Sequence, residues 1–360
     1  VFEPGSHWHR FCRYILPNAN TAKARSYYEA QRPYFVEAAR TYRLHPYFSK
    51  TRVESLEGVT YHGVITQRMA AMAQQLQEEG RDDFRIEKDR CAMYTFLQRN
   101  GFPTCKVLGM WYNETEFLEE LREGDVLRGS TKWPMFLKAC HLTQSSSKAT
   151  RTLVDKASTL AELDDISAWI HEKWEFRAND FDRMWMADGN KLTDTVTPGF
   201  LVQEPMQQQK EWTTRGRFAI GLAEFKVEVY WGRAYLALLD GTHIFLRDGT
   251  IEDFSTPWGV LANGVANPDL LWMFEEGYMD CIWDLAERVA GATHADSMRI
   301  DIFLSEGNPG GCTVNENSLS SGMIYHGHEQ WMARIWAEPL VTGSYKLLED
   351  DTPVHMLGPN

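Results

Sequence analysis

Two short segments carry residue types that phosphoryl transfer needs. Residues 299–303 read RIDIF and residues 315–322 read NENSLSSG. They predict two antiparallel strands, 299–304 and 312–317, whose side chains alternate between two faces. Arg299 and Asp301 then share a face beside Glu316. Two carboxylates can hold a Mg²⁺ ion that is shared with substrate phosphates. The alternative is an edge hairpin with ordinary surface charges.

Lysines upstream offer partners for phosphate. Lys138 lies in an apolar segment, 135–140, that is a predicted strand. Such a lysine either extends its charged end to water or reaches a ligand phosphate. Residues 144–147 read QSSS, and they form either a loop over phosphates or a surface loop. Lys88 opens a predicted helix with Asp89 and Arg90, for which a surface charge cluster is the alternative.

Two further segments fit a nucleotide site. Glu204 ends the apolar strand 199–203 and precedes a proline, which suits a linker between two lobes where backbone groups meet a base edge. Glu224, Lys226 and Glu228 alternate to one face of a predicted strand, so that face is polar. A solvated sheet face is the alternative.

Composition limits the classes of function. The chain has 360 residues, enough for two or three packed units, and a net charge of −13 that disfavours non-specific nucleic-acid binding. No apolar run approaches the length of a membrane span, and the N-terminus lacks the apolar core of a signal peptide. Six scattered cysteines without a CxxC pair suit a reducing compartment, so a cytoplasmic location is expected. The P-loop, GxGxxG and GxSxG motifs are absent.

Periodicity predicts alternating helices and strands. Helices are expected at 20–45, 64–80, 91–97, 116–122, 158–186 and 269–289. Strands are expected at 103–108, 135–140, 152–154 and 199–203, followed by a meander of 218–223, 225–231 and 234–239. This order predicts an α+β fold with mixed sheets.

The order of these segments resembles the ATP-grasp superfamily, with the clearest local likeness to D-alanine–D-alanine ligases. Residues 133–138 (WPMFLK) are similar to its "fPvivKP" strand, and residues 224–227 (EFKV) to its "EFTV". Residues 299–302 (RIDI) and 316–322 (ENSLSSG) are similar to "RIDV" and "EANTSPG". KDR at 88–90 and VQE at 202–204 complete the series. The resemblance covers residues 87–325, and FLKACH at 136–141 also resembles the TupA-like branch.

The resemblance implies an ATP-grasp fold of two α/β lobes, with mixed or antiparallel sheets, that clamp a nucleotide. A largely helical N-terminal region, 1–86, would have a substrate or acceptor role. The first lobe would span 87–201, the second lobe with the metal site 202–345, and a C-terminal tail 346–360.

The resemblance also implies a role for each site residue. Lys88 and Lys138 would contact the ATP phosphates. Gln203 and Glu204 would sit at the adenine, and Glu224 at the ribose, with Lys226 or Glu228 as alternatives for that role. Asp301, Glu316 and Ser318 would hold Mg²⁺, and Arg299 would face developing charge. Ser318 stands where the family has asparagine, so Asn315 or Asn317 is the alternative ligand.

The implied activity is an ATP-dependent ligase. It would join a small-molecule carboxylate, activated as an acyl phosphate, to an amine, and would release ADP and phosphate in amino-acid, peptide or specialised-metabolite biosynthesis. No nucleic acid or membrane partner is expected, and a homodimer is the default oligomer. The alternatives are an ATP-grasp kinase, a metal-dependent nucleotide-sugar transferase and a non-catalytic nucleotide-binding module.

Overall fold

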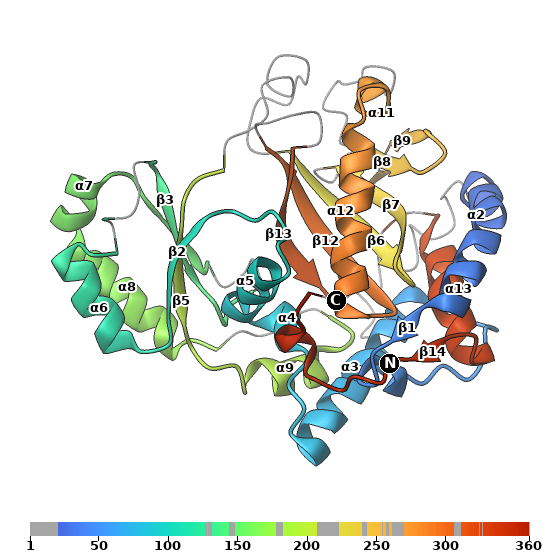
Figure 1. The fold of residues 1–360 in the computed structure, drawn as a ribbon, viewed down its shortest axis with the longest axis horizontal. Helices are drawn as coiled ribbons and strands as arrows, with labels where there is room; N and C mark the ends of the chain where they lie inside the picture. The colour runs from blue at the N-terminus through green and yellow to red at the C-terminus, as the bar shows by residue number, and fades with distance from the viewer. Residues whose placement is uncertain are drawn as a thin grey trace.

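The chain forms two sheet-containing lobes and a helical N-terminal region (Figure 1). The computed structural model describes residues 21–126, 128, 132–143, 148–177, 183–206, 223–239, 243–253, 255–256, 259–260, 270–305, 311–323, 325 and 327–359. The expected fold class, α+β with mixed or antiparallel sheets, is confirmed.

The N-terminal region is helical, as expected. It contains α2 (Thr21–Thr41), β1 (Arg43–Leu44), η2 (Phe48–Lys50), α3 (Tyr61–Glu79) and α4 (Arg85–Lys88). The Thr60 side chain caps the start of α3 by accepting from the Gly63 N–H at 3.1 Å, and Gly80 ends the helix in the left-handed conformation. Helix α2 packs on α13 (Glu329–Thr342), so this region is part of the second lobe's core.

The first lobe is built on a four-stranded antiparallel sheet in the order β2-β5-β3-β4. Its strands are β2 (Val107–Trp111), β3 (Met135–Ala139), β4 (Thr150–Leu153) and β5 (Phe200–Gln203). Helices α6 (Glu114–Glu123), α7 (Lys156–Ala161) and α8 (Leu163–Glu175) lie beside this sheet (Figure 1), while α5 (Arg90–Arg99) and α9 (Met186–Thr193) lie towards the second lobe. Because β5 pairs with β2 and β3, residues 202–203 lie in the sheet of the first lobe.

The second lobe is built on a six-stranded antiparallel sheet in the order β13-β12-β6-β7-β8-β9. Its strands are β6 (Glu224–Tyr230), β7 (Arg233–Leu239), β8 (His243–Leu246), β9 (Ile251–Asp253), β12 (Ser297–Leu304) and β13 (Cys312–Ser318). Helix α12 (Tyr278–Thr293), preceded by α11 (Trp272–Glu275), packs along β12, β6 and β7 (Figure 1). The short elements are β10 (Ser255–Thr256), β11 (Gly259–Val260), β14 (Lys346–Leu347) and η5 (Val354–Met356), and β14 pairs with β1.

Several expected elements differ in extent. The strand expected at 103–108 begins only at Val107, because the preceding residues join the lobes instead: Pro103 O accepts from the Val314 N–H at 2.9 Å. The helix expected at 158–186 is divided into separate helices, and the one expected at 269–289 is interrupted at Gly277, whose φ is 79°. The strand expected at 218–223 falls almost wholly outside the described residues, and the meander continues through β8 and β9.

Four of the six cysteines are paired. Cys91 is bonded to Cys140 and Cys281 to Cys312, while Cys105 is a buried free thiol. The sequence argument for a reducing compartment did not anticipate these pairs, because partners 49 and 31 residues apart have no local signal. Within the described part of the chain, no helix has the length and apolar character needed to cross a membrane.

Candidate active site

Three neighbouring strands bring the predicted residues to one face of the second sheet. In the register, Asp301 on β12 lies between Glu316 on β13 and Lys226 on β6. Arg299 lies in the same way between Ser318 and Glu228. The alternation expected for the hairpin and for 224–228 is therefore confirmed. This polar face carries Glu224, Lys226, Glu228, Arg299, Asp301, Glu316 and Ser318.

A β-bulge decides which asparagine joins the polar face. The register shifts between Asp301 and Ile302, so that Asn315 is the extra residue on β13. The Asn315 Nδ2 donates to Glu224 Oε1 at 2.8 Å. Asn317 lies opposite Ile300 instead, and its amide is fully buried with no hydrogen-bond partner among the described residues. Of the two alternatives to Ser318, only Asn315 reaches the site.

Asp301 is held by two cations. Arg299 donates to both of its oxygens, Nε to Oδ1 at 2.6 Å and Nη2 to Oδ2 at 3.0 Å. Lys226 Nζ bridges Asp301 Oδ2 at 2.8 Å and Glu224 Oε2 at 2.6 Å. Burial alone would raise the pKa of Asp301, but Arg299 and Lys226 outweigh it and the pKa is lowered. Burial would likewise lower the pKa of Lys226, but Asp301 and Glu224 outweigh it and that pKa is raised.

Glu316 differs from Asp301 in having no bonded partner among the described residues. No residue in the described parts of the chain donates a hydrogen bond to its carboxylate, and the side chain is partly exposed. Burial and the neighbouring Asp301 raise the pKa of Glu316, against the opposing effect of Arg90. Glu316 is therefore the carboxylate of this face that is open to a ligand.

Glu228 is sequestered at the other end of the face. Its carboxylate accepts from Ser321 Oγ at 2.7 Å, from Tyr325 OH at 2.7 Å and from Tyr61 OH at 3.1 Å. Burial raises the pKa of Glu228, and Arg299 and these hydroxyls oppose it. Tyr61 belongs to α3, so the N-terminal region closes this end of the site.

Lys88 reaches the site from α4. Its Nζ lies 3.2 Å from Glu87 Oε1 and 3.3 Å from Ser320 Oγ, and the side chain is 2% exposed. Ser318 Oγ and Ser320 Oγ donate to the same Glu87 oxygen at 3.1 and 2.6 Å. Asp89 caps α5 and is fully buried, so the surface-cluster alternative is wrong for Lys88 and Asp89. Sequence reasoning missed Glu87, although it directly precedes Lys88.

Lys138 reaches the site from the first lobe. It lies on β3 between Thr150 and Leu201, and burial lowers the pKa of Lys138 to about 8, with a smaller lowering effect from Arg90. Glu316 and Glu224 of the second lobe act on the pKa of Lys138 in the opposite direction. Arg90 was also missed as a site residue. It donates to Ala139 O at 3.1 Å and to Leu142 O, and this fixes the end of β3.

The predicted adenine residues lie at the end of β5. Gln203 Oε1 accepts from Tyr94 OH at 3.3 Å, and the same hydroxyl lies 3.4 Å from Asn315 O. Glu204 Oε1 lies 2.8 Å from Lys106 Nζ. Tyr94 thus links the first lobe to the polar face, a contact with no sequence signal. The predicted QSSS loop, 144–147, lies outside the described residues.

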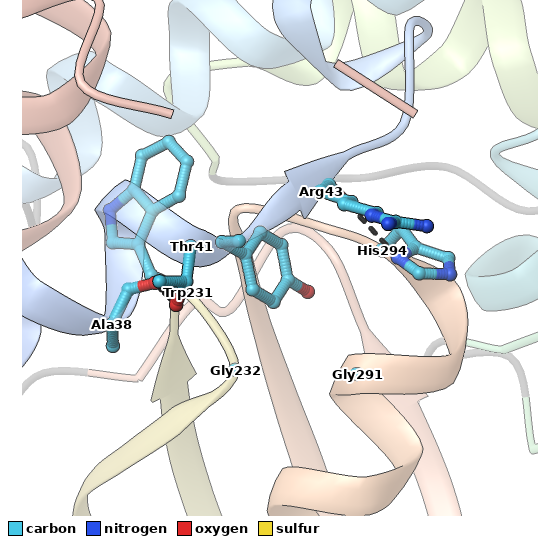
Figure 2. A pocket seen from close by; sticks show the side chains of 8 residues that line it. Ala38, Thr41, Arg43, Trp231, Gly232, Gly291 and His294 are labelled. Atoms are coloured by element: carbon cyan, nitrogen blue, oxygen red, sulfur yellow. Dashed lines mark hydrogen bonds between the residues drawn. The ribbon is translucent and has the colours of Figure 1, made fainter. Parts of the chain in front are cut away.

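A separate pocket lies on the second lobe. Its volume is about 350 Å³, and Figure 2 shows it between the end of α2, the β6–β7 turn and the end of α12. Trp231, Gly232 and His294 line it, and His294 Nδ1 lies 2.9 Å from Arg43 O. Trp231 follows the end of β6 that is opposite to Glu224, so this pocket is distinct from the polar face.

Comparisons with known proteins give structural matches only. No family model matches the sequence, and no curated protein matches it. The D-alanine–D-alanine ligase from Helicobacter pylori matches at 14% identity with a TM-score of 0.32, over 71% of this chain and 61% of that protein. The enzyme of the same name from Bacillus anthracis, solved with ATP, matches at 11% identity and a TM-score of 0.38, over 76% and 75%. A RimK domain ATP-grasp protein from Sphaerobacter thermophilus matches at 13% identity and a TM-score of 0.37, over 77% and 69%.

The solved structures named here are ligases or ATP-grasp proteins, and two of the matches, the RimK domain protein and the ligase PsnB, carry ATP-grasp in their names. This is the superfamily that the sequence motifs resemble. The chain spans 61% of the length of the Helicobacter pylori ligase.

Proposed function

We propose that this chain is an ATP-grasp ligase that joins a small-molecule carboxylate to an amine. The observation that carries the proposal is the polar face itself. Asp301, Arg299 and Glu316 meet on adjacent strands, and Lys138 of the other lobe lies within the electrostatic influence of Glu316. Cations from two lobes around carboxylates, of which Glu316 is open to a ligand, suit a nucleoside triphosphate with its metal ion.

The residues of the face fit Mg²⁺. Glu316 and Asp301 offer carboxylate oxygens, while the Ser318 hydroxyl and the Asn315 amide oxygen lie on the same face. Oxygen ligands in small number, with the rest supplied by phosphates and water, are what Mg²⁺ prefers. When bound, the ion supplies positive charge that neutralises the phosphates.

The other residues bind and orient the substrates. Lys88 and Lys138 hold the phosphates, Gln203 and Glu204 meet the adenine, and Glu224 meets the ribose. A substrate carboxylate oxygen attacks the γ-phosphorus, and the bond to ADP breaks. The amine nitrogen then attacks the acyl carbon, phosphate leaves with the bonding pair, and the nitrogen loses a proton. Arg299 stabilises the oxyanion of this second step. Catalysis rests on positioning and electrostatics, in amino-acid, peptide or specialised-metabolite biosynthesis.

The test is calorimetric titration with β,γ-imido-ATP, with and without Mg²⁺. Wild-type protein is expected to bind the analogue only when Mg²⁺ is present. Glu316→Gln is expected not to bind it even with Mg²⁺, because the carboxylate that holds the ion is gone. Glu119→Gln, on the exposed side of α6, is the matched control and should bind as wild type does.

Carboxylates and amines are then screened for ADP release. Phosphate release that depends on both an acid and an amine supports the ligase, whereas a phosphorylated product formed without an amine indicates a kinase. Absence of analogue binding under all conditions would overturn the proposal.

A further inference from the structure

A lysine ammonium fills the gap between two carboxylates of the polar face. Lys226 Nζ lies 2.6 Å from Glu224 Oε2 and 2.8 Å from Asp301 Oδ2. A Mg²⁺ ion shared by these carboxylates would lie about 2.1 Å from each oxygen, which is the space that the ammonium already takes. The lysine is only partly exposed, and it is anchored from both sides by short ion pairs.

The number of hydrogen bonds that Asp301 already accepts also limits how many ions it can bind. An ionised carboxylate has about four lone-pair sites. Arg299 uses one on Oδ1 and one on Oδ2, and Lys226 uses another on Oδ2. One site remains, on Oδ1. Asp301 therefore has room for one ion and cannot bridge two.

Glu316 is the carboxylate left to carry that ion. It lies opposite Asp301 across the β12–β13 pair, and no described side chain donates to it. Glu224 is not equivalent, because Asn315 donates to its Oε1 at 2.8 Å while Lys226 holds its Oε2.

We propose that this site binds a single divalent ion, on Glu316 and the remaining lone pair of Asp301, and that the Lys226 ammonium holds the position of a second. The inference rests on the proposed nucleotide site. It assigns Lys226 a positioning role as a fixed cation, and a neutral side chain at 226 would open the Glu224–Asp301 gap to another ion.

The test counts Mn²⁺ ions by electron paramagnetic resonance of the free ion. Protein is kept in excess over β,γ-imido-ATP, so that all of the analogue is bound and Mn²⁺ is counted per bound nucleotide. Wild type and Lys226→Arg, which keeps the charge, are expected to bind one Mn²⁺. Lys226→Met is expected to bind two. Lys191→Met, an exposed lysine on α9, is the control and should bind one.

The possible failures are distinguishable. Two Mn²⁺ ions in wild type overturn the single-ion site. A single ion in Lys226→Met that still binds the analogue overturns the role of Lys226 as the occupant of a second ion position. Both outcomes leave the nucleotide site standing. No binding of the analogue by wild type overturns both proposals. If Lys226→Met does not fold, as judged by circular dichroism, Lys226→Gln takes its place with the same expected count.

Discussion

Lys138 shows how burial sets the charge of a single site residue. Its aliphatic stem lies in β3, and burial lowers the pKa of Lys138 from its usual value near 10.5 to about 8. Below pH 8 the side chain is a cation that can bind phosphate, and above pH 8 the free protein loses this charge. Phosphate affinity should therefore depend on pH around pH 8.

We expect the affinity for the Mg²⁺ complex of β,γ-imido-ATP to fall as pH rises above 8. Protonation of Lys138 must precede binding there, so each pH unit should weaken binding about tenfold. The measurement is calorimetry from pH 7.5 to 9.5. Lys138→Arg stays charged throughout and should give a flat profile. A wild-type affinity that does not change up to pH 9.5 would show that Lys138 does not bind the phosphates.

At the scale of elements, the β6–β7 turn depends on one glycine. Trp231 and Gly232 have φ values of 53° and 74°, and positive φ at both central positions is the geometry of a two-residue hairpin turn that follows strand twist. A Cβ added to Gly232 would lie 2.7 Å from Tyr42 Cε2. The Tyr42 ring cannot easily move away, because its hydroxyl donates to Ala295 O at 2.8 Å.

Gly232→Ala should therefore destabilise the protein more than Gly249→Ala does. Both glycines have positive φ, so both variants lose about 1 kcal/mol from backbone strain. Gly249 has open space around its Cβ position, whereas Gly232→Ala adds a clash that costs about 1–3 kcal/mol more. Urea unfolding of the two variants measures the difference. Equal midpoints would show that Tyr42 yields to the added methyl group.

At the scale of the whole molecule, α3 attaches the N-terminal region to the second lobe. Arg68 is fully buried and forms an ion pair with Asp296, which also accepts from Trp336 Nε1 at 2.6 Å. Arg68 also donates to Ser297 O at 2.9 Å and to Leu319 O at 3.1 Å. These contacts hold α3 against the start of β12 and the loop after β13, so the helix supports the strands that carry the candidate site.

Arg68→Met should cost about 3–5 kcal/mol of unfolding free energy, because it leaves the Asp296 carboxylate buried and uncompensated. Arg25→Met breaks an exposed ion pair with Glu29 and should cost no more than about 1 kcal/mol. Urea denaturation followed by Trp fluorescence compares them. Similar losses in both variants would mean that Asp296 gains another partner or is neutral in the folded protein.

Much of the site could be predicted from short-range pattern. The period of two along 224–228 and 299–303 placed Lys226, Arg299 and Asp301 on polar faces, since alternation is a property of any strand. The left-handed end of α3 at Gly80 and the hairpin of β12 and β13 were also predictable, because caps and adjacent strands depend on neighbours in the chain.

Other features were decided only by tertiary structure. The bulge that brings Asn315 to Glu224 depends on strand register. The Lys226–Asp301 ion pair and the contacts of Glu87 and Tyr61 with the polar face join segments from 75 to 231 residues apart. The Cys91–Cys140 and Cys281–Cys312 pairs likewise join segments that are distant in the sequence. Periodicity fixes which face a side chain takes, but register and packing between distant segments fix which side chains meet on it.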